Sequence, residues 1–359
     1  MDSCERLRVA LMRTGLPDMV PIVDISYWPE TIERWHKEGL PEGISPADYL
    51  GMDKIGIVHF DCSLRLPRKV LKETDRFQTF VDEFGATVKA FKDWRISFSP
   101  PSRIDYLVKN RSDWHKFREK FFPDESRITD SSWQEYNQAK SAGIFTVISP
   151  IEPAWFFLEH VVGFERGLSA MVEEPEFVID VLKDCTEFVI GMLKISRRIG
   201  MNFDGLWFFS DMCYKNGPLF SPNYYRRFIL PFHQEIAKFC HENGMALILH
   251  CDGDIRQLLP LFIEAGFDCI QPLEARCGND VRQLKPIYGT KITFFGNIST
   301  DIMSSSKAKI EEEVVSKITV AKEGGGYIYH SDHSIPPTVS FENYIFVIEL
   351  AKKYGKYEK

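Results

Sequence analysis

The sequence predicts an α/β fold, a TIM-like (β/α)8 barrel that spans residues 1–359 as a single domain. From about residue 144 onward, short apolar segments alternate with amphipathic helical segments in six consecutive β–α units, which is typical of parallel strands joined by helices. No GxGxxG motif follows any of the apolar segments, which favours a barrel over the open sheet of a nucleotide-binding fold. No linker, repeat or low-complexity tract divides the chain, so one domain is the simplest organisation.

The N-terminal third adds the remaining strands and an elaboration of the barrel. The apolar segment PDMVPIVDISYW at 17–28 is predicted to be the first barrel strand, between helices at 4–15 and 30–41. Residues 54–109 are rich in aromatic and β-branched residues and predict hairpin-type strands, one of which belongs to the barrel. Residues 111–142 have helical spacing. With six strands further on, the count reaches eight.

The regular part of the chain takes strands and helices in turn. The predicted strands lie at 145–153, 203–212, 246–253, 267–274, 293–299 and 326–333. The predicted helices lie at 156–163, 174–200, 223–244, 254–266, 279–289, 307–324 and 341–355.

Composition limits the function. The hydrophobic content of 44% is enough for a large core, and the formal net charge of −7 argues against nucleic acid and anionic membranes as partners. The N-terminus lacks the long apolar region of a signal peptide, and no apolar run is long enough to span a membrane. The eight cysteines form no CxxC pair, which indicates reduced thiols. We therefore expect a cytoplasmic protein whose partners are small molecules or other proteins.

Polar residues gather at the predicted strand ends. The active site of a (β/α)8 barrel lies at the C-terminal ends of its strands, so these residues are the candidates for function. They are Asp24, Glu152, Ser210, Asp211, His250, Asp252, Glu274, Asn297, His330, Asp332 and His333.

Four of these residues predict a metal site. His250 and Asp252 are two positions apart, so on an extended strand end both side chains point to the same side. Glu274 and His333 end two later strands, and closure of the barrel brings such ends together. Imidazole and carboxylate ligands with an open position suit zinc. The alternative is that these side chains only satisfy backbone groups at the strand ends.

Three further residues are candidates for substrate contacts. Asp211 follows an apolar strand and is predicted to bind substrate or to act in proton transfer, although a capping or ion-pair role fits equally well. Asp24 and Trp28, at the end of the first strand, are predicted to line a substrate pocket. Cys251 points away from His250 and Asp252 by strand alternation and is expected in the core.

The sequence resembles the uroporphyrinogen decarboxylase superfamily, in particular its cobamide-dependent methyltransferase branch. The resemblance covers nearly the whole chain and is carried by the segments at 17–28, 249–289 and 294–299 and by GGYIYHSDHSIPPTVSFENY near the C-terminus. It implies a (β/α)8 barrel that moves a methyl group between a small molecule and a corrinoid carried by a separate protein, with a zinc ion that activates the methyl donor or acceptor.

The chain departs from the zinc motif of that branch, which is typically His-x-Cys with a later cysteine. His250 matches the histidine, whereas Asp252 and His333 stand where the two cysteines are expected, and Glu274 matches a glutamate near the metal. A site without thiolates is harder and favours Lewis-acid polarisation of an oxygen over activation of a thiol. The segment YWPETIERW stands where the true decarboxylases carry an arginine-rich segment, which favours the methyltransferase branch.

Three functions are therefore open. The leading hypothesis is a zinc-dependent, demethylating methyltransferase that passes the methyl group of a small O-methyl or N-methyl compound to a corrinoid protein. The first alternative is a metal-free decarboxylase or lyase that acts on a small carboxylated substrate, with Asp211 in proton transfer. The second is a non-catalytic, corrinoid-associated binding protein. The sequence leaves a homodimer open as an assembly state, and it does not identify the methyl donor.

Overall fold

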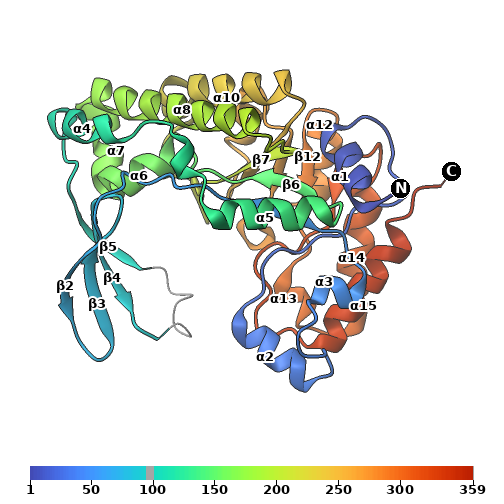
Figure 1. The fold of residues 1–359 in the computed structure, drawn as a ribbon. Helices are drawn as coiled ribbons and strands as arrows, with labels where there is room; N and C mark the ends of the chain where they lie inside the picture. The colour runs from blue at the N-terminus through green and yellow to red at the C-terminus, as the bar shows by residue number, and fades with distance from the viewer. Residues whose placement is uncertain (94–100, 359) are drawn as a thin grey trace.

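A curled, seven-stranded parallel sheet forms the wall of the barrel. The structure, a computed structural model, describes residues 1–93 and 101–358 (Figure 1). The strands lie in the order β1-β6-β7-β10-β11-β12-β13 and all neighbours are parallel. Their bounds are β1 Ile55–Val58, β6 Phe145–Ile148, β7 Gly205–Phe209, β10 Ala246–His250, β11 Cys269–Gln271, β12 Thr293–Phe295 and β13 Tyr327–Ile328. The predicted (β/α)8 fold is confirmed.

The eighth position of the barrel is held by the predicted first strand, although it is not a regular strand. Ile22 forms a parallel bridge with Tyr329, next to β13, and its carbonyl oxygen accepts a 2.8 Å hydrogen bond from the backbone of Asp53, next to β1. The segment 17–28 contains Pro17 and Pro21, which have no backbone N–H to donate to a ladder. Isolated bridges therefore replace the continuous strand expected there.

Helices cover the outside of the wall (Figure 1). The longest, α8, begins at Pro175, and apolar residues such as Phe177, Val181 and Phe188 bury one of its faces. The helices of the barrel are α5 Asp130–Ser141, α6 Trp155–Val162, α7 Phe164–Glu173, α8 Pro175–Arg198, α9 Pro222–Tyr224, α10 Leu230–Glu242, α11 Leu259–Ala265, α12 Val281–Tyr288, α13 Thr300–Met303, α14 Lys307–Ala321 and α15 Phe341–Tyr354. A π-helical turn, Tyr225–Ile229, joins α9 to α10, and 3-10 turns lie at Arg118–Lys120, Glu125–Arg127 and Ala275–Cys277. Among the described residues, no helix has the length and apolar character to cross a lipid bilayer.

The N-terminal elaboration consists of short helices and an antiparallel sheet. The helices are α1 Ser3–Met12, α2 Pro29–Lys37, α3 Pro46–Leu50 and α4 Arg111–Phe117. The sheet has the order β2-β3-β4-β5, with β2 Lys69–Glu73, β3 Phe77–Val81, β4 Ala86–Phe91 and β5 Ser102–Tyr106. Figure 1 shows it standing away from the barrel next to α6 and α7. The prediction of hairpin strands is confirmed, and the part of it that falls on residues 94–100 lies outside the described residues.

Helix α1 closes one end of the barrel. Its buried residues Leu7, Ala10 and Leu11 share a cluster with side chains from the barrel interior, including Trp207 and Phe295. Arg6 of the same helix forms a 2.7 Å ion pair with Asp53. Because α1 fills this end, the strand ends that carry the polar candidate residues form the accessible mouth.

A two-stranded hairpin extends this mouth beyond β7. It consists of β8, Cys213–Tyr214, and β9, Gly217–Pro218, which pair antiparallel. The hairpin begins two residues after Asp211 and contacts the loop after β10, where the backbone N–H of Asp254 donates to the Tyr214 carbonyl oxygen at 3.0 Å. The loops after β7 and β10 are thus held together over the site.

Candidate metal-binding and active site

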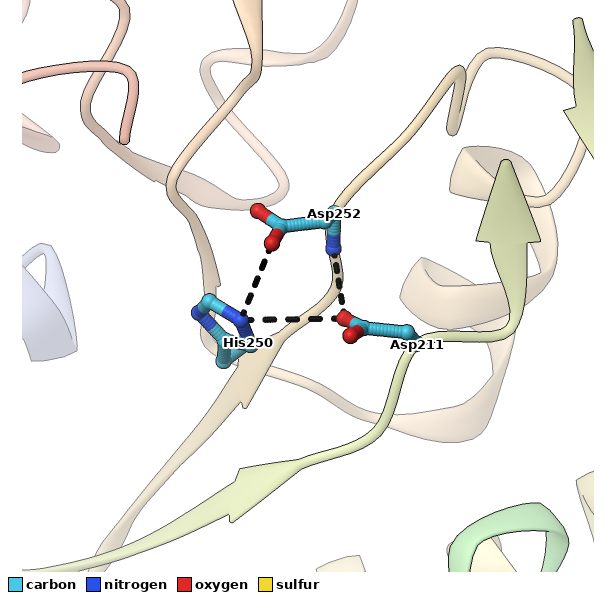
Figure 2. Close-up of side chains that lie close together, drawn as sticks. All are labelled: Asp211, His250 and Asp252. Carbon is cyan, nitrogen blue, oxygen red and sulfur yellow. Dashed lines mark hydrogen bonds and ion pairs between the residues drawn. The ribbon is translucent and has the colours of Figure 1, made fainter. Parts of the chain in front are cut away.

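Three side chains from two neighbouring strands converge at the barrel mouth. Asp211 follows β7, His250 ends β10 and Asp252 follows it; one ligand atom from each lies within 4.8 Å of the other two (Figure 2). His250 Nε2 is 3.6 Å from Asp211 Oδ1 and 3.7 Å from Asp252 Oδ2. The Asp252 backbone N–H donates to Asp211 Oδ1 at 2.9 Å and fixes the two loops relative to each other. We call these three residues the His–Asp–Asp cluster.

The tautomer of His250 follows from the hydrogen bonds that Gln271 and His330 form on its Nδ1 side. The backbone N–H of Ile25 points at His330 Nε2 at 3.4 Å, so this nitrogen accepts, and His330 Nδ1 donates to the Ser331 carbonyl oxygen. The amide of Gln271 therefore donates to His330 Nε2, also at 3.4 Å, and its Oε1 must face His250. His250 Nδ1 lies 2.6 Å from this oxygen and carries the proton. The free lone pair of His250, on Nε2, points into the His–Asp–Asp cluster.

This donor set fits a divalent cation. The Nε2 atom of an imidazole and two carboxylate oxygens face one another, an arrangement that a cation stabilises. Two ligands bound at about 2 Å to one tetrahedral zinc lie roughly 3.4 Å apart, close to the separations of 3.6 and 3.7 Å seen here. Asp252 Oδ1 is buried and has no hydrogen-bond partner among the described residues. Burial raises the pKa of the Asp252 carboxyl above its ordinary value, and the negative charge of Asp211 adds to the effect.

His333 and Glu274 lie next to the cluster in different ways. His333 Nε2 is 3.9 Å from Asp252 Oδ2. Glu274 uses both oxygens elsewhere, because Oε1 accepts from Arg276 and Oε2 accepts from the Gly253 backbone N–H at 2.9 Å. Burial opposes ionisation of Glu274, but these contacts outweigh it and lower its pKa. The structure thus brings Asp211, His250, Asp252 and His333 together. Glu274 instead contacts Arg276 and the Gly253 loop, and its ligand role stays a prediction.

The two predicted pocket residues at the first strand end lie outside the cluster. Asp24 is buried, and its carboxylate accepts hydrogen bonds from the Ser331 backbone N–H at 2.7 Å and the Tyr344 hydroxyl at 2.8 Å. Trp28 caps α2, and its backbone N–H donates to the Ile335 carbonyl oxygen at 3.1 Å. Neither residue is among the described residues that line the two cavities at the cluster. Their substrate-binding roles stay predictions, and the geometry gives Asp24 a part in joining the first and last strands.

Two cavities meet at Asp252. The inner cavity, of about 180 Å³, lies on the side of the first and last strands and is lined by Ile25, Ser26, Phe209, His250, Asp252, Gln271, Pro272, His330, His333 and Ser334. The outer cavity, of about 440 Å³, lies under the β8–β9 hairpin and is lined by Asp211, Cys213, Tyr214, Lys215, Asp252, Gly253, Glu274, Arg276 and Cys277. The His–Asp–Asp cluster therefore borders two cavities of different volume, and both are lined by Asp252.

Sequence reasoning missed Gln271 and Phe209. Gln271 pairs with His250 in the register of β10 and β11, and the Phe209 ring lies 4.8 Å from the His250 ring at an interplanar angle of 32°. The signal for Gln271 was a lone amide in the apolar strand FDCIQP. Phe209 carries no such signal, since an aromatic residue in an apolar strand is ordinary core composition. His330, one of the strand-end candidates for function, is buried and belongs to the hydrogen-bond chain that runs through Gln271 to His250.

Glu152 anchors the base of the site. It is fully buried and accepts hydrogen bonds from Ser210 Oγ at 2.9 Å and from the backbone N–H groups of Ala154 and Phe156. His233 Nε2 lies 2.6 Å from Glu152 Oε1. Because Ser210 immediately precedes Asp211, this buried network fixes the end of β7 from which Asp211 projects.

Comparisons with known proteins identify the family. The model of the uroporphyrinogen decarboxylase (URO-D) family matches residues 137–354, more than half of the chain, and the chain belongs to this family. The matched region contains the His–Asp–Asp cluster, Gln271 and His333. A solved structure of a methyltransferase from Methanosarcina mazei has a TM-score of 0.66, 17% identity, and coverage of 98% of both chains, which confirms the fold.

Two curated relatives match over part of their length. A methylated-thiol–coenzyme M methyltransferase of Methanosarcina mazei is 28% identical over 127 residues, 35% of this chain and 33% of that protein. A uroporphyrinogen decarboxylase of Idiomarina loihiensis is 25% identical over 204 residues, 54% of this chain and 52% of that protein. The matches thus span between a third and about half of the length of these relatives. The resemblance inferred from the sequence is confirmed for the family, with a methyltransferase among its relatives.

Proposed function

We propose that the protein is a methyltransferase that takes a methyl group from a small O-methyl or N-methyl compound and passes it to the corrinoid of a partner protein. The convergence of His250 Nε2 with Asp211 and Asp252 carries this proposal. Membership of the URO-D family and the likeness to a methylated-thiol–coenzyme M methyltransferase support the methyl-transfer chemistry.

The proposed metal is zinc, which Asp211, His250 and Asp252 would hold, and His333 Nε2 lies 3.9 Å from Asp252 Oδ2. Nitrogen and oxygen ligands are among those that zinc takes, and three protein ligands leave a position open, as catalytic zinc sites require. Bound there, the metal would act as a Lewis acid on the oxygen or nitrogen atom that loses the methyl group. Glu274 would hold the Gly253 loop through its 2.9 Å hydrogen bond to the Gly253 N–H.

The protein's own residues would bind and orient the methyl donor. A small methyl donor in the inner cavity would lie against the Phe209 ring and beside His250. The hydrogen bond to Gln271 would hold the His250 ring with Nε2 directed at the cluster. A corrinoid partner would reach the same cluster through the outer cavity, which shares Asp252 with the inner one. Two cavities at one cluster suit transfer of a group between a small donor and a large acceptor.

One rival has an observation in its favour. Uroporphyrinogen decarboxylases match the chain over about half its length, so a metal-free decarboxylase or lyase is the second candidate. In that case Asp211 would act in proton transfer, and purified protein would hold no stoichiometric zinc. The third hypothesis, a non-catalytic corrinoid-associated protein, predicts tight partner binding without methyl transfer.

The proposal is tested by metal analysis and a methyl-transfer assay on the same protein. We expect one zinc per chain and the appearance of the methylcob(III)alamin spectrum when the enzyme is mixed with cob(I)alamin and a panel of methyl ethers and methylamines. His250→Ala should lose bound zinc and turnover together, whereas His115→Ala, at an exposed position of α4, should lose neither. Full turnover by metal-free His250→Ala protein would show that the cluster is not the site.

A further inference from the structure

We propose that the methyl donor of this protein carries no negative charge: the inner cavity selects small uncharged or cationic methyl compounds and rejects anionic ones. The inference rests on the proposed function and deepens it by naming the substrate class. It is carried by the size of the inner cavity, the side chains that line it, and the position of the cationic side chains nearby.

The size of the inner cavity limits the donor to a small molecule. Its volume is about 180 Å³. An apolar protein cavity of about 150 Å³ accommodates benzene, so a donor of roughly one six-membered ring or smaller fits here. The lining of the inner cavity includes the apolar residues Ile25, Phe209 and Pro272, which offer packing contacts without charge.

The charges at the inner cavity disfavour an anion. Its lining, among the residues that the structure describes, includes the carboxylate of Asp252 but no lysine or arginine. The cationic side chains at the mouth, Lys215 and Arg276, line the outer cavity instead. Arg276 is paired there with Glu274. An anionic donor in the inner cavity would be desolvated beside a carboxylate and without a counter-charge, which is costly.

A metal in the cluster does not remove this discrimination. The two charges of a divalent cation are matched by the carboxylates of Asp211 and Asp252. The hydrogen-bond chain through Gln271 sets the orientation of His250 and His330, and the amide of Gln271 adds no charge to the lining of the cavity. His333 Nε2 faces the same Asp252 carboxylate at 3.9 Å. The metal and its two carboxylates together therefore offer no net positive charge to a donor carboxylate, sulfonate or phosphate.

Three methyl ethers of nearly equal size test the inference directly. 2-Methoxyethanol is uncharged, 2-methoxyethylammonium is cationic and methoxyacetate is anionic. Their dissociation constants from zinc-loaded protein are measured by ligand-observed NMR titration, together with those of ring-sized uncharged and anionic methyl ethers. We expect each anionic member to bind at least tenfold more weakly than its uncharged partner. Equal or tighter binding of the anionic members overturns the inference, as does an absence of binding by every uncharged and cationic member.

A variant that adds a positive charge to the inner cavity checks that this cavity is responsible for the charge selection. Ser334 lines this cavity and donates its hydroxyl to Ser26 Oγ at 2.8 Å. Ser334→Lys should tighten binding of the anionic ethers at least fivefold, and Ser334→Met, of similar length without charge, should not. Equal effects of the two variants contradict the inference.

Failure of the inference and failure of the proposed function give different results. Preferential binding of uncharged ethers without transfer to cob(I)alamin leaves the charge selection standing and refutes the methyltransferase. Transfer from methoxyacetate at the rate of 2-methoxyethanol supports the methyltransferase and refutes the charge selection.

Discussion

His250 owes its orientation to a neutral amide rather than to a carboxylate. Many metal-binding histidines donate their second ring N–H to a carboxylate, which increases the electron density on the ligand nitrogen. Here the acceptor is Gln271 Oε1, 2.6 Å from His250 Nδ1, and the amide is itself set by His330. Burial lowers the pKa of His330, which keeps it in the neutral form that this chain of hydrogen bonds requires. The chain thus fixes the His250 ring without adding charge beneath a cluster that already holds two carboxylates.

Removing the Gln271 acceptor should weaken metal binding. We expect Gln271→Leu to raise the zinc dissociation constant about 10- to 100-fold, because His250 loses the partner that sets its tautomer and ring orientation. Gln271→Glu keeps an acceptor and should bind zinc at least as tightly as the wild type. Competition with a chromophoric chelator measures both constants. Gln283→Leu, at an exposed position of α12, is the control, and an unchanged affinity in Gln271→Leu would refute the role of the amide.

The sequence predicted which side chains come together better than it predicted their contacts. Asp211, His250, Asp252 and His333 were candidates because the strand ends of a barrel converge, and the structure has them near one another. The contacts of Glu274 with Arg276 and Gly253 depend on the conformation of one loop, and the role of Gln271 depends on the register of two strands. Neither is determined by the local pattern of residues.

At the scale of elements, the site depends on a close approach between the β8–β9 hairpin and the loop after β10. Gly253 has a φ of +86°, and a Cβ atom there would lie 2.7 Å from the backbone C of Cys213 and the backbone N of Tyr214. Backbone atoms cannot move away as a flexible side chain can. A glycine is therefore required between Asp252 and Asp254, and it holds the hairpin against the cluster.

Substitution of Gly253 should disturb stability and metal binding together. We expect Gly253→Ala to lower the free energy of unfolding by about 2–4 kcal/mol, the sum of left-handed strain and overpacking. Gly143→Ala is a matched control, because Gly143 has a φ of +66° with no atom within 4 Å of its added Cβ. It should cost only about 1 kcal/mol and leave zinc affinity unchanged. Urea denaturation measures both variants, and equal losses would show that the hairpin contact is unimportant.

Helix α6 and the antiparallel sheet share a buried histidine. His160 of α6 contacts the Phe84 ring and lies 2.7 Å, through Nδ1, from the Phe156 carbonyl oxygen. Burial lowers the pKa of His160 to about 4, and the positive charge of Arg103 on β5 acts in the same direction. A histidine in the unfolded chain binds its proton near pH 6.5. Between these two pH values the unfolded state binds more protons, so stability falls as the pH falls.

Stability should therefore decline on acidification through His160. Each pH unit within the window corresponds to about 1.4 kcal/mol, which gives a loss of about 2 kcal/mol between pH 6.5 and pH 5. His160→Gln keeps a hydrogen-bond donor but does not titrate, so its stability should fall by about 2 kcal/mol less over the same interval. Denaturant titrations at several pH values measure the difference. Parallel pH dependence of the two proteins would refute the assignment to His160.

The sequence predicted best those elements in which the hydrophobic residues keep one period over many positions. The helix predicted at 174–200 is present as α8, Pro175–Arg198. The helix predicted at 254–266 is shorter, since α11 spans only Leu259–Ala265, and the preceding residues form turns in which Asp254 binds the Arg256 backbone N–H at 3.1 Å. Local side-chain hydrogen bonds of this kind compete with the helix and are not visible in hydrophobic spacing.

At the scale of the whole molecule, the two ends of the chain close the barrel. The segment around Ile22 lies between Tyr329, next to β13, and Asp53, next to β1, and Asp24 accepts hydrogen bonds from Ser331 and Tyr344. Helix α1 then fills the end opposite the site. The sequence predicted a helix at 4–15 but not where this helix packs in the fold. An apolar face shows that a helix is partly buried, but it does not show which surface covers that face. The single-domain organisation over 1–359 stays a prediction.

The closing role of α1 can be measured with one substitution. Leu11 is fully buried, in the cluster that includes Trp207 and Phe295, whereas Leu16, a few residues later, is 51% exposed. Leu11→Ala should lower the free energy of unfolding by about 2–5 kcal/mol, because it removes buried methyl groups and leaves a cavity in the barrel interior. Leu16→Ala should change it by less than about 0.5 kcal/mol. Urea denaturation distinguishes the two, and similar small losses in both variants would mean that α1 lies against the barrel without contributing to its core.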